Sequence, residues 1–311
     1  MSPEELKRSI RGLIVTPVTP FKSNFELDEV GWRELVRRLI DSGVRKGDGI
    51  IVPGSATGEF DVMTLEERKR IVKIAVDEAD GEVPIVAAAN ATDPKVTIKI
   101  AEYGEEVGAD GIMMGPPYYE KPGPEEVIKF YETVAEATDL GIIVYNNGYA
   151  TQFDMPTSLL SELVSKVDKI VGLKELGGLS GMVWPKIEAS INALKDRISV
   201  FQGPGIFFEP QACMVGDVGF CEWTIVNFAP QLPVSLWRAI KEKDWGRAQE
   251  IHDNLMPLLW FLMKDRHYAR FKEAMNLLGF KGGVVRPPRG PIPPEEREEL
   301  RKLLAKYDLL K

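Results

Sequence analysis

The chain has 311 residues, 44% of them hydrophobic, and a formal net charge of -8 at pH 7. Phosphate binding depends on clustered lysines and arginines, so this acidic balance argues against a nucleic-acid surface. The length allows a sizeable core, either in one large α/β barrel or in two ordinary domains.

The first residues, MSPEELKRSI, lack the apolar core of a secretory signal, and no apolar run approaches the roughly 20 residues that span a bilayer. Only two cysteines occur, Cys213 and Cys221, which are too few for a disulfide framework in a chain of this length. We therefore expect a cytoplasmic protein with no membrane segment.

Short runs rich in Val, Ile and Gly recur along the chain, and each is followed by a longer segment of helical periodicity. Eight such runs begin at Gly12, Gly49, Pro84, Gly111, Gly141, Ile170, Ile198 and Val218. This alternation predicts parallel strands covered by helices, and eight strands favour a (β/α)₈ barrel. The alternative is a doubly wound open sheet, but no glycine-rich dinucleotide turn follows the first strand.

Strand signals stop at about Lys243. The next segment, from Asp244 to Phe280, has the apolar spacing of two helices, and RPPRGPIPP forms a stiff connector before a last helix, PEEREELRKLLAKYDLL. We therefore expect a barrel over residues 1–242 and a C-terminal helical extension over residues 243–311.

The stretch VGLKEL places a lysine, Lys174, in an apolar run that reads as a buried strand. Alternation puts Gly172 and Lys174 on the same face, so the glycine leaves room beneath the lysine. A desolvated lysine is expected to have a lowered pKa, and its neutral amine can attack a ketone to form a Schiff base. The alternative is a strand-end lysine paired with an acid such as Glu175.

Two other strand ends carry candidate site residues. The second strand ends in PGSATGEF, where small residues let backbone N–H groups approach an anion and where Ser55, Thr57 and Gly58 could hold a carboxylate. The fifth strand ends in VYNN, with Tyr145 and Asn147 on one face, and a phenol there can relay a proton. The alternative for the second strand end is a turn that binds no ligand. The alternative for Tyr145 is an aromatic side chain that only caps the barrel.

Three further segments could contribute to a site. After the fourth strand, Tyr119 lies in the proline-stiffened loop PPYYEKPGP, which suggests a substrate lid or an oligomer contact. The eighth strand offers Cys221, Glu222 and Trp223 as substrate contacts, although Glu222 could equally be a surface acid or a helix-start residue. His252 and His267 lie in the helical extension, and we expect both to be structural.

In this order, GSATGE, PPYYEKP, VYNN and GLKE resemble the dihydrodipicolinate synthase/N-acetylneuraminate lyase family over nearly the whole chain. The resemblance implies a (β/α)₈ barrel with a helical extension, a homotetramer built from dimers, and Schiff-base chemistry on pyruvate or another 2-oxo acid without a metal or organic cofactor. By position it implies that Lys174 forms the Schiff base and Tyr145 relays protons. It implies that Thr57, with the backbone of Gly58, holds the carboxylate, and that Tyr119 enters the site of a neighbouring subunit.

The chain departs from this family pattern at the relay and at the aldehyde anchor. Ala56 replaces a hydroxyl residue of the proton relay, and Ala150 replaces the arginine that grips a carboxylated aldehyde in the synthase. We therefore expect an aldehyde partner other than aspartate semialdehyde, or a deoxy-oxo sugar acid if the protein is a dehydratase. A barrel that binds a small acid without turnover is another alternative. A phosphosugar enzyme would need a phosphate loop after strands seven and eight, for which QGPG is a poor candidate.

Overall fold

The computed structural model describes residues 1–177, 183–204 and 219–310. Its eight parallel strands coincide with the eight predicted runs. They are β1 (Leu13–Val15), β2 (Gly49–Ile51), β3 (Val86–Ala88), β4 (Gly111–Met114), β5 (Gly141–Asn146), β6 (Ile170–Glu175), β7 (Ser199–Gln202) and β8 (Gly219–Glu222).

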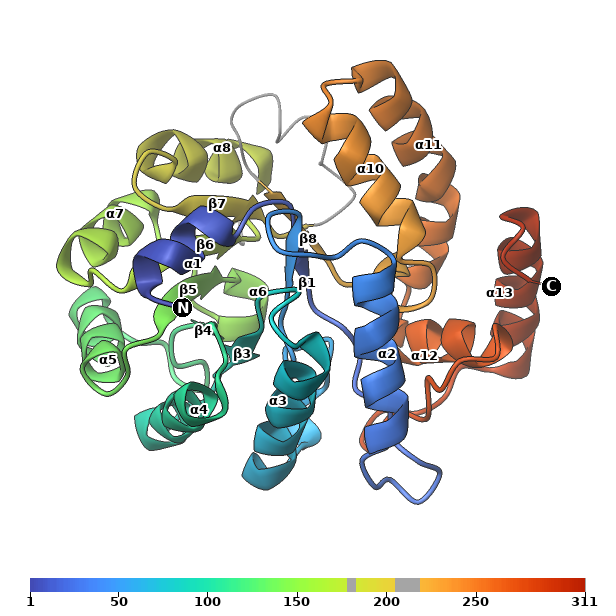
Figure 1. The fold of residues 1–311 in the computed structure, drawn as a ribbon, viewed down its shortest axis with the longest axis horizontal. Coiled ribbons are helices and arrows are strands. Elements are labelled where there is room, and N and C mark those ends of the chain that lie inside the picture. Colours follow the sequence, from blue (N-terminus) through green and yellow to red (C-terminus); the bar gives the residue numbers. More distant parts are fainter. Residues whose placement is uncertain (178–182, 205–218, 311) are drawn as a thin grey trace.

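The strands form one sheet in the order β2-β1-β8-β7-β6-β5-β4-β3. A parallel bridge between Ile51 and Ile85 joins the two ends of this sheet, so the ring is nearly closed. Helices surround it, as Figure 1 shows. The predicted (β/α)₈ barrel is therefore confirmed, and the open-sheet alternative is wrong.

The helices around the strands begin where capping residues and acids favour them. Thr64 caps α3 in a capping box with Glu67, and Asp93 caps α4 just before Pro94. The helices of this part are α1 (Pro3–Ser9), α2 (Glu29–Asp41), α3 (Leu65–Ala79), α4 (Pro94–Val107), α5 (Pro124–Glu136), α6 (Gly148–Thr151), α7 (Thr157–Lys166), α8 (Val183–Leu194) and α10 (Gln231–Lys241). Two short 3-10 turns are η1 (Phe60–Val62) and η3 (Ile225–Asn227).

The N-terminal segment, for which the sequence predicted no role, closes one end of the barrel. Leu6 of α1 and Ile10 just after it are fully buried, and they pack with the inward-facing side chains of the strands. Figure 1 shows α1 lying in front of the strands in this view. With this end covered, a ligand would enter at the carboxyl ends of the strands, where barrel enzymes place their chemistry.

The C-terminal extension packs on one side of the barrel, beside α2 and α10 (Figure 1). It contains α11 (Trp245–Leu262), α12 (His267–Leu277) and α13 (Pro294–Lys306), as predicted. Its apolar residues, such as Leu258 and Phe271, belong to the same buried cluster as Trp32 of α2 and Trp237 of α10. Within the described ranges, no helix has the length and apolar character needed to cross a membrane.

Candidate active site

Lys174 points into the barrel, as strand alternation predicted. It pairs in register with Tyr145 of β5, and its Nζ lies 4.9 Å from the centroid of the Tyr145 ring. A Cβ at Gly172 would lie 3.3 Å from atoms of Ile10 and of Ile143, so this position faces the packed interior directly beneath the lysine. Only 5% of Lys174 is exposed, so its amine is largely shielded from water.

The neighbours of Lys174 act against the effect of its burial. Burial is the largest influence, and it lowers the pKa of Lys174. The ionised forms of Cys221 and Tyr145 raise this pKa, as does a hydrogen bond with Cys221. The net shift of the Lys174 pKa is upward. The lowered pKa expected from the sequence is therefore wrong for the unliganded site. The Cys221 thiol is itself fully buried, and burial raises its pKa.

Glu175 does not pair with Lys174, because successive strand residues point to opposite faces. Its carboxylate accepts hydrogen bonds from Asn146 Nδ2 (3.0 Å), the Gly177 amide (3.0 Å) and Ser190 Oγ (3.1 Å). Burial raises the pKa of Glu175 to about 7 despite these donors. The alternative of a lysine held by a neighbouring acid is therefore wrong, and Glu175 instead ties the ends of β5 and β6 to α8.

Tyr145 and Asn147 are joined at the end of β5. Asn147 Nδ2 donates a 2.6 Å hydrogen bond to the Tyr145 hydroxyl oxygen, so the position of the phenol is fixed. The Oδ1 of the same side chain accepts from the backbone N–H groups of Tyr149 and Ala150 and caps α6. Asn147 therefore couples the orientation of the predicted relay residue to the short helix that follows the strand.

The turn after β2 brings hydroxyl groups towards the lysine. Thr57 Oγ1 lies 3.4 Å from Thr16 Oγ1, which in turn lies 3.8 Å from Cys221 Sγ. Ser55 Oγ is buried and has no hydrogen-bond partner within the described part of the chain. An unpaired buried hydroxyl is costly unless a ligand satisfies it, so this turn suits an oxyanion.

A buried ion pair with the C-terminal extension also fixes this turn. Glu59 has a left-handed backbone (φ 59°), and its fully buried carboxylate lies 2.5 Å from Lys272 Nζ of α12. Lys272 also donates to the Val284 carbonyl oxygen (2.7 Å), and the Arg286 amide donates to Glu59 (3.3 Å). The C-terminal extension thus holds the end of the turn that carries Ser55 and Thr57.

The candidate site is a cavity of about 150 Å³ at the carboxyl ends of the strands. Residues singled out in the sequence line it from three strand ends: Ser55, Ala56, Thr57, Tyr145, Asn147, Ala150 and Lys174. The structure therefore brings together the lysine, the tyrosine and the hydroxyl turn, and it also places the two alanine substitutions on the wall of the same cavity.

Part of the wall comes from the C-terminal extension, where no functional residue was predicted. His267 and Tyr268, at the start of α12, line the cavity together with Trp223, which follows β8. His267 was expected to be structural, and the structure places its ring on the cavity wall, at the start of α12 after the left-handed turn at Arg266. His252 is buried on α11 next to Asp253 and does not line the cavity. Of these three wall residues, Trp223 was the one that the sequence indicated, through its position at the end of the eighth strand.

Four predicted site residues do not line the cavity in this single chain. Cys221 lies among the interior side chains of the barrel, where it contacts Lys174. Glu222 accepts hydrogen bonds from the Thr224 amide (2.6 Å) and hydroxyl (2.7 Å), so it caps the turn before η3 rather than facing a ligand. A Cβ on Gly58 would lie 3.1 Å from Thr19 Oγ1, which makes it a close-packing position. Tyr119 is 88% exposed.

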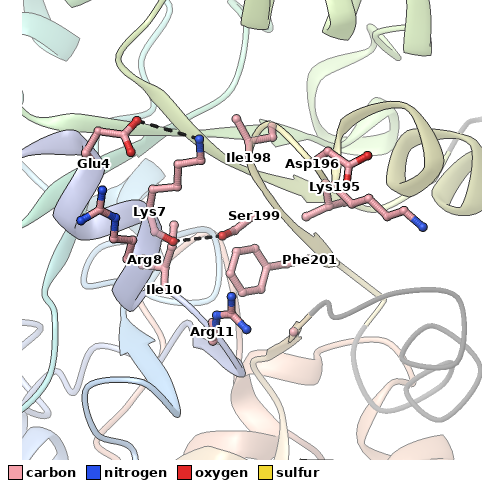
Figure 2. A pocket seen from close by; sticks show the side chains of 12 residues that line it. Glu4, Lys7, Arg8, Ile10, Arg11, Lys195, Asp196, Ile198, Ser199 and Phe201 are labelled. Atoms are coloured by element: carbon pink, nitrogen blue, oxygen red, sulfur yellow. Dashed lines mark hydrogen bonds and ion pairs between the residues drawn. The ribbon is translucent and has the colours of Figure 1, made fainter.

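A second cavity, of about 350 Å³, lies at the opposite end of the barrel between α1 and the first residues of β7 and β8. Figure 2 shows its charged side chains, which include Lys7 beside Glu4, and the hydrogen bond from Ser199 to the Lys7 carbonyl oxygen. It contains none of the predicted site residues. Cys213 and the last glycine of QGPG lie outside the described residues.

Comparisons with known proteins cover nearly all of the chain. The model of the dihydrodipicolinate synthetase family matches residues 9–307. A protein of Methanopyrus kandleri named 4-hydroxy-tetrahydrodipicolinate synthase is 33% identical over 302 residues, which cover 97% of each chain. A relative of the same name from Methanothermobacter thermautotrophicus is 33% identical over 270 residues, which cover 87% of this chain and 93% of the relative.

Solved structures of dihydrodipicolinate synthases and of related proteins also match this chain. The crystal structure of dihydrodipicolinate synthase from Thermotoga maritima matches with a TM-score of 0.89 at 28% identity, and the match covers 97% of this chain and 100% of that one. YagE, a prophage protein of the dihydrodipicolinic acid synthase family from E. coli K12 in complex with pyruvate, matches with a TM-score of 0.86 at 27% identity, covering 96% and 99%. The likeness therefore includes both the barrel and the C-terminal extension.

Proposed function

The chain belongs to the dihydrodipicolinate synthetase family, and on that premise we propose that it joins pyruvate, or a similar 2-oxo acid, to an aldehyde through a Schiff base on Lys174. Membership of this family makes the chain a lyase. The single observation that carries the residue assignment is the buried amine of Lys174 in a cavity that also contains Tyr145 and the Ser55–Thr57 turn.

The hydroxyl turn holds the carboxylate of the 2-oxo acid. Ser55 Oγ is buried without a partner among the described residues, and Thr57 Oγ1 has only a long contact with Thr16. Both hydroxyls can donate to a carboxylate oxygen, and small residues let the backbone approach it. The carboxylate of the 2-oxo acid then lies in the same cavity as the amine of Lys174. The attraction between these two groups favours entry of an anionic substrate.

Lys174 and Tyr145 carry the covalent steps. The neutral amine adds to the keto carbon of the 2-oxo acid, protons move through the Tyr145 hydroxyl, and water leaves to form an imine. Loss of a proton from the adjacent carbon gives an enamine, whose carbon forms a bond to the aldehyde carbon. The aldehyde oxygen takes up a proton, and hydrolysis of the imine releases the product and regenerates Lys174. The reverse sequence cleaves a 4-hydroxy-2-oxo acid.

The aldehyde partner differs from that of the relatives named 4-hydroxy-tetrahydrodipicolinate synthase. Ala150 lines the cavity where the family pattern has an arginine, so the bidentate anchor for a carboxylated aldehyde is missing. Ala56 also lines the cavity, at a position where the family pattern has a hydroxyl residue of the proton relay, so that hydroxyl is missing here. Thr16, which lies between Thr57 and Cys221, offers another hydroxyl near the lysine.

Replacement of Lys174 tests this function. We expect Lys174→Ala to lower pyruvate-dependent turnover by at least about a thousandfold, because the covalent route is closed, while the circular dichroism spectrum stays unchanged. Lys129, which is exposed on α5, provides the matched control, and Lys129→Ala should retain wild-type turnover. Full activity of Lys174→Ala would refute the assignment.

A further inference from the structure

Three rings form a preformed aromatic wall of the cavity. Trp223 and His267 meet edge to face with ring centroids 5.9 Å apart, and His267 meets Tyr268 in the same way at 4.1 Å. Phe271 supports them from α12, 6.1 Å from Trp223 and 5.9 Å from His267. Rings held against one another in this way offer an apolar surface at little entropic cost.

The described lining of the cavity is poor in cationic side chains that could bind an anion. Among the described residues that line it, Lys174 is the only lysine or arginine. Residues 178–182 and 205–218 contain no Lys, Arg or His in the sequence, so they cannot supply another. Once Lys174 has reacted with the 2-oxo acid, a second carboxylate in this cavity would lack a cationic partner.

The imidazole in the wall does not replace the missing cation. Burial, together with nearby Arg289 and Arg270, lowers the pKa of His267 to about 4. Below that value the ring is charged, and above it the ring is neutral, so at pH 7 His267 is an uncharged aromatic group. It can pack against a ligand or form a neutral hydrogen bond, but it does not attract a carboxylate.

Arg289 lies behind this wall, and its charge is already matched by acids. Its guanidinium carbon is 5.3 Å from the Tyr268 ring centroid, on which it packs. Its nitrogens lie 2.8 Å from Asp61 and 3.9 Å from Glu59. The arginine does not line the cavity, so it supports the Tyr268 ring and adds no charge to the cavity surface.

We propose that the aldehyde partner is an uncharged aromatic aldehyde, whose ring packs on Trp223, His267 and Tyr268 while its carbonyl carbon faces the enamine on Lys174. This inference rests on the proposed Schiff-base function and adds the substrate class. The new carbon–carbon bond joins the methyl-derived carbon of pyruvate to the aldehyde carbon. The aldehyde oxygen becomes a hydroxyl by taking a proton, and no oxidant or reductant is needed.

A matched set of aldehydes tests the substrate class on the wild-type protein with saturating pyruvate. Benzaldehyde is the probe, 4-carboxybenzaldehyde adds only a charge to the same ring, and propanal removes the ring. We expect kcat/KM for benzaldehyde to exceed the values for both others by at least about tenfold. A preference for 4-carboxybenzaldehyde, or equal use of propanal, would overturn the inference.

Four variants connect the preference to the wall. Trp223→Ala and Tyr268→Ala should each lower kcat/KM for benzaldehyde by at least about tenfold, while pyruvate still forms a borohydride-trapped adduct. Trp260→Ala removes an exposed tryptophan of α11 and should change neither measurement. Ala150→Arg places a cation in the cavity and should shift preference towards 4-carboxybenzaldehyde. Unchanged benzaldehyde kinetics in both wall variants would contradict the proposed contact.

The pyruvate adduct separates failure of this inference from failure of the proposed function. Absence of an adduct with the wild-type protein would overturn the Schiff-base function and the inference that rests on it. An adduct without turnover of benzaldehyde would overturn the aromatic substrate class alone.

Discussion

Lys174 reacts only when its amine is neutral, and its neighbours hold it in the charged form. The net shift of its pKa is upward from about 10.5, because the ionised forms of Cys221 and Tyr145 outweigh burial. Below the pKa, the neutral fraction rises tenfold with each pH unit. At neutral pH the resting lysine is therefore protonated, and the arrival of a 2-oxo acid must be coupled to loss of that proton.

This titration predicts the pH dependence of the first step. We expect log(kcat/KM) for pyruvate to rise with a slope near 1 between about pH 6 and pH 9 without reaching a plateau. Cys221→Ala removes a group whose thiolate raises the pKa of Lys174, so burial, which lowers that pKa, should shift the alkaline part of the profile towards lower pH. A wild-type plateau below about pH 8, or an unchanged profile in Cys221→Ala, would contradict this explanation.

At the scale of elements, the carboxylate-binding turn depends on a helix distant in sequence. Glu59 ends the turn after β2, and Lys272 belongs to α12, yet their charged groups form a fully buried pair. Burial lowers the pKa of Lys272 to about 8 in spite of this acid. Because α12 also carries His267 and Tyr268, one helix positions both the turn and the aromatic wall.

Breaking this pair should damage stability and pyruvate binding together. Lys272→Met leaves the buried Glu59 carboxylate with the more distant Arg289, at 3.9 Å, in place of its close cation, and we expect a loss of about 3–5 kcal/mol in the free energy of unfolding and a raised KM for pyruvate. The double variant Glu59→Gln with Lys272→Met removes the uncompensated charge. It should recover part of the stability, which urea titration measures. Equal stability of the single variant and the wild type would contradict this role.

Much of the fold could be predicted because apolar strand runs and amphipathic helices alternate locally. The inward direction of Lys174 followed from alternation with Gly172, and the turn at Ser55 to Gly58 from small residues. The short sequence of α1 did not indicate that this helix covers one end of the barrel. That role depends on which end of the barrel the helix packs against. His267 was missed for the same reason, because a distant helix reaches the strand ends only through tertiary packing.

At the scale of the whole molecule, the exposed loop after β4 suggests assembly. Tyr119 is 88% exposed, an unusual position for a large aromatic side chain in the proline-rich segment PPYYEKPGP. We expect a homotetramer in which this side chain enters the site of a neighbouring subunit, as the family resemblance implies. The cavity described for one chain would then gain a further wall on assembly.

Native mass spectrometry and kinetics of Tyr119 variants test this expectation together. The wild type should have the mass of four chains. Tyr119→Ala should lower kcat by about tenfold or more, because a group positioned at the site is lost. Tyr119→Phe keeps the ring and separates its packing from the hydroxyl. A fully active monomer, or full activity of Tyr119→Ala, would contradict the shared site.

The most direct test of the central claim is intact-mass spectrometry after incubation with pyruvate and borohydride, followed by peptide mapping. We predict one reduced pyruvyl adduct per chain on Lys174, and no adduct in the Lys174→Ala variant. An adduct on another lysine, or persistence of the adduct in Lys174→Ala, would contradict the assignment. Absence of any adduct in the folded wild type would contradict the Schiff-base account as a whole.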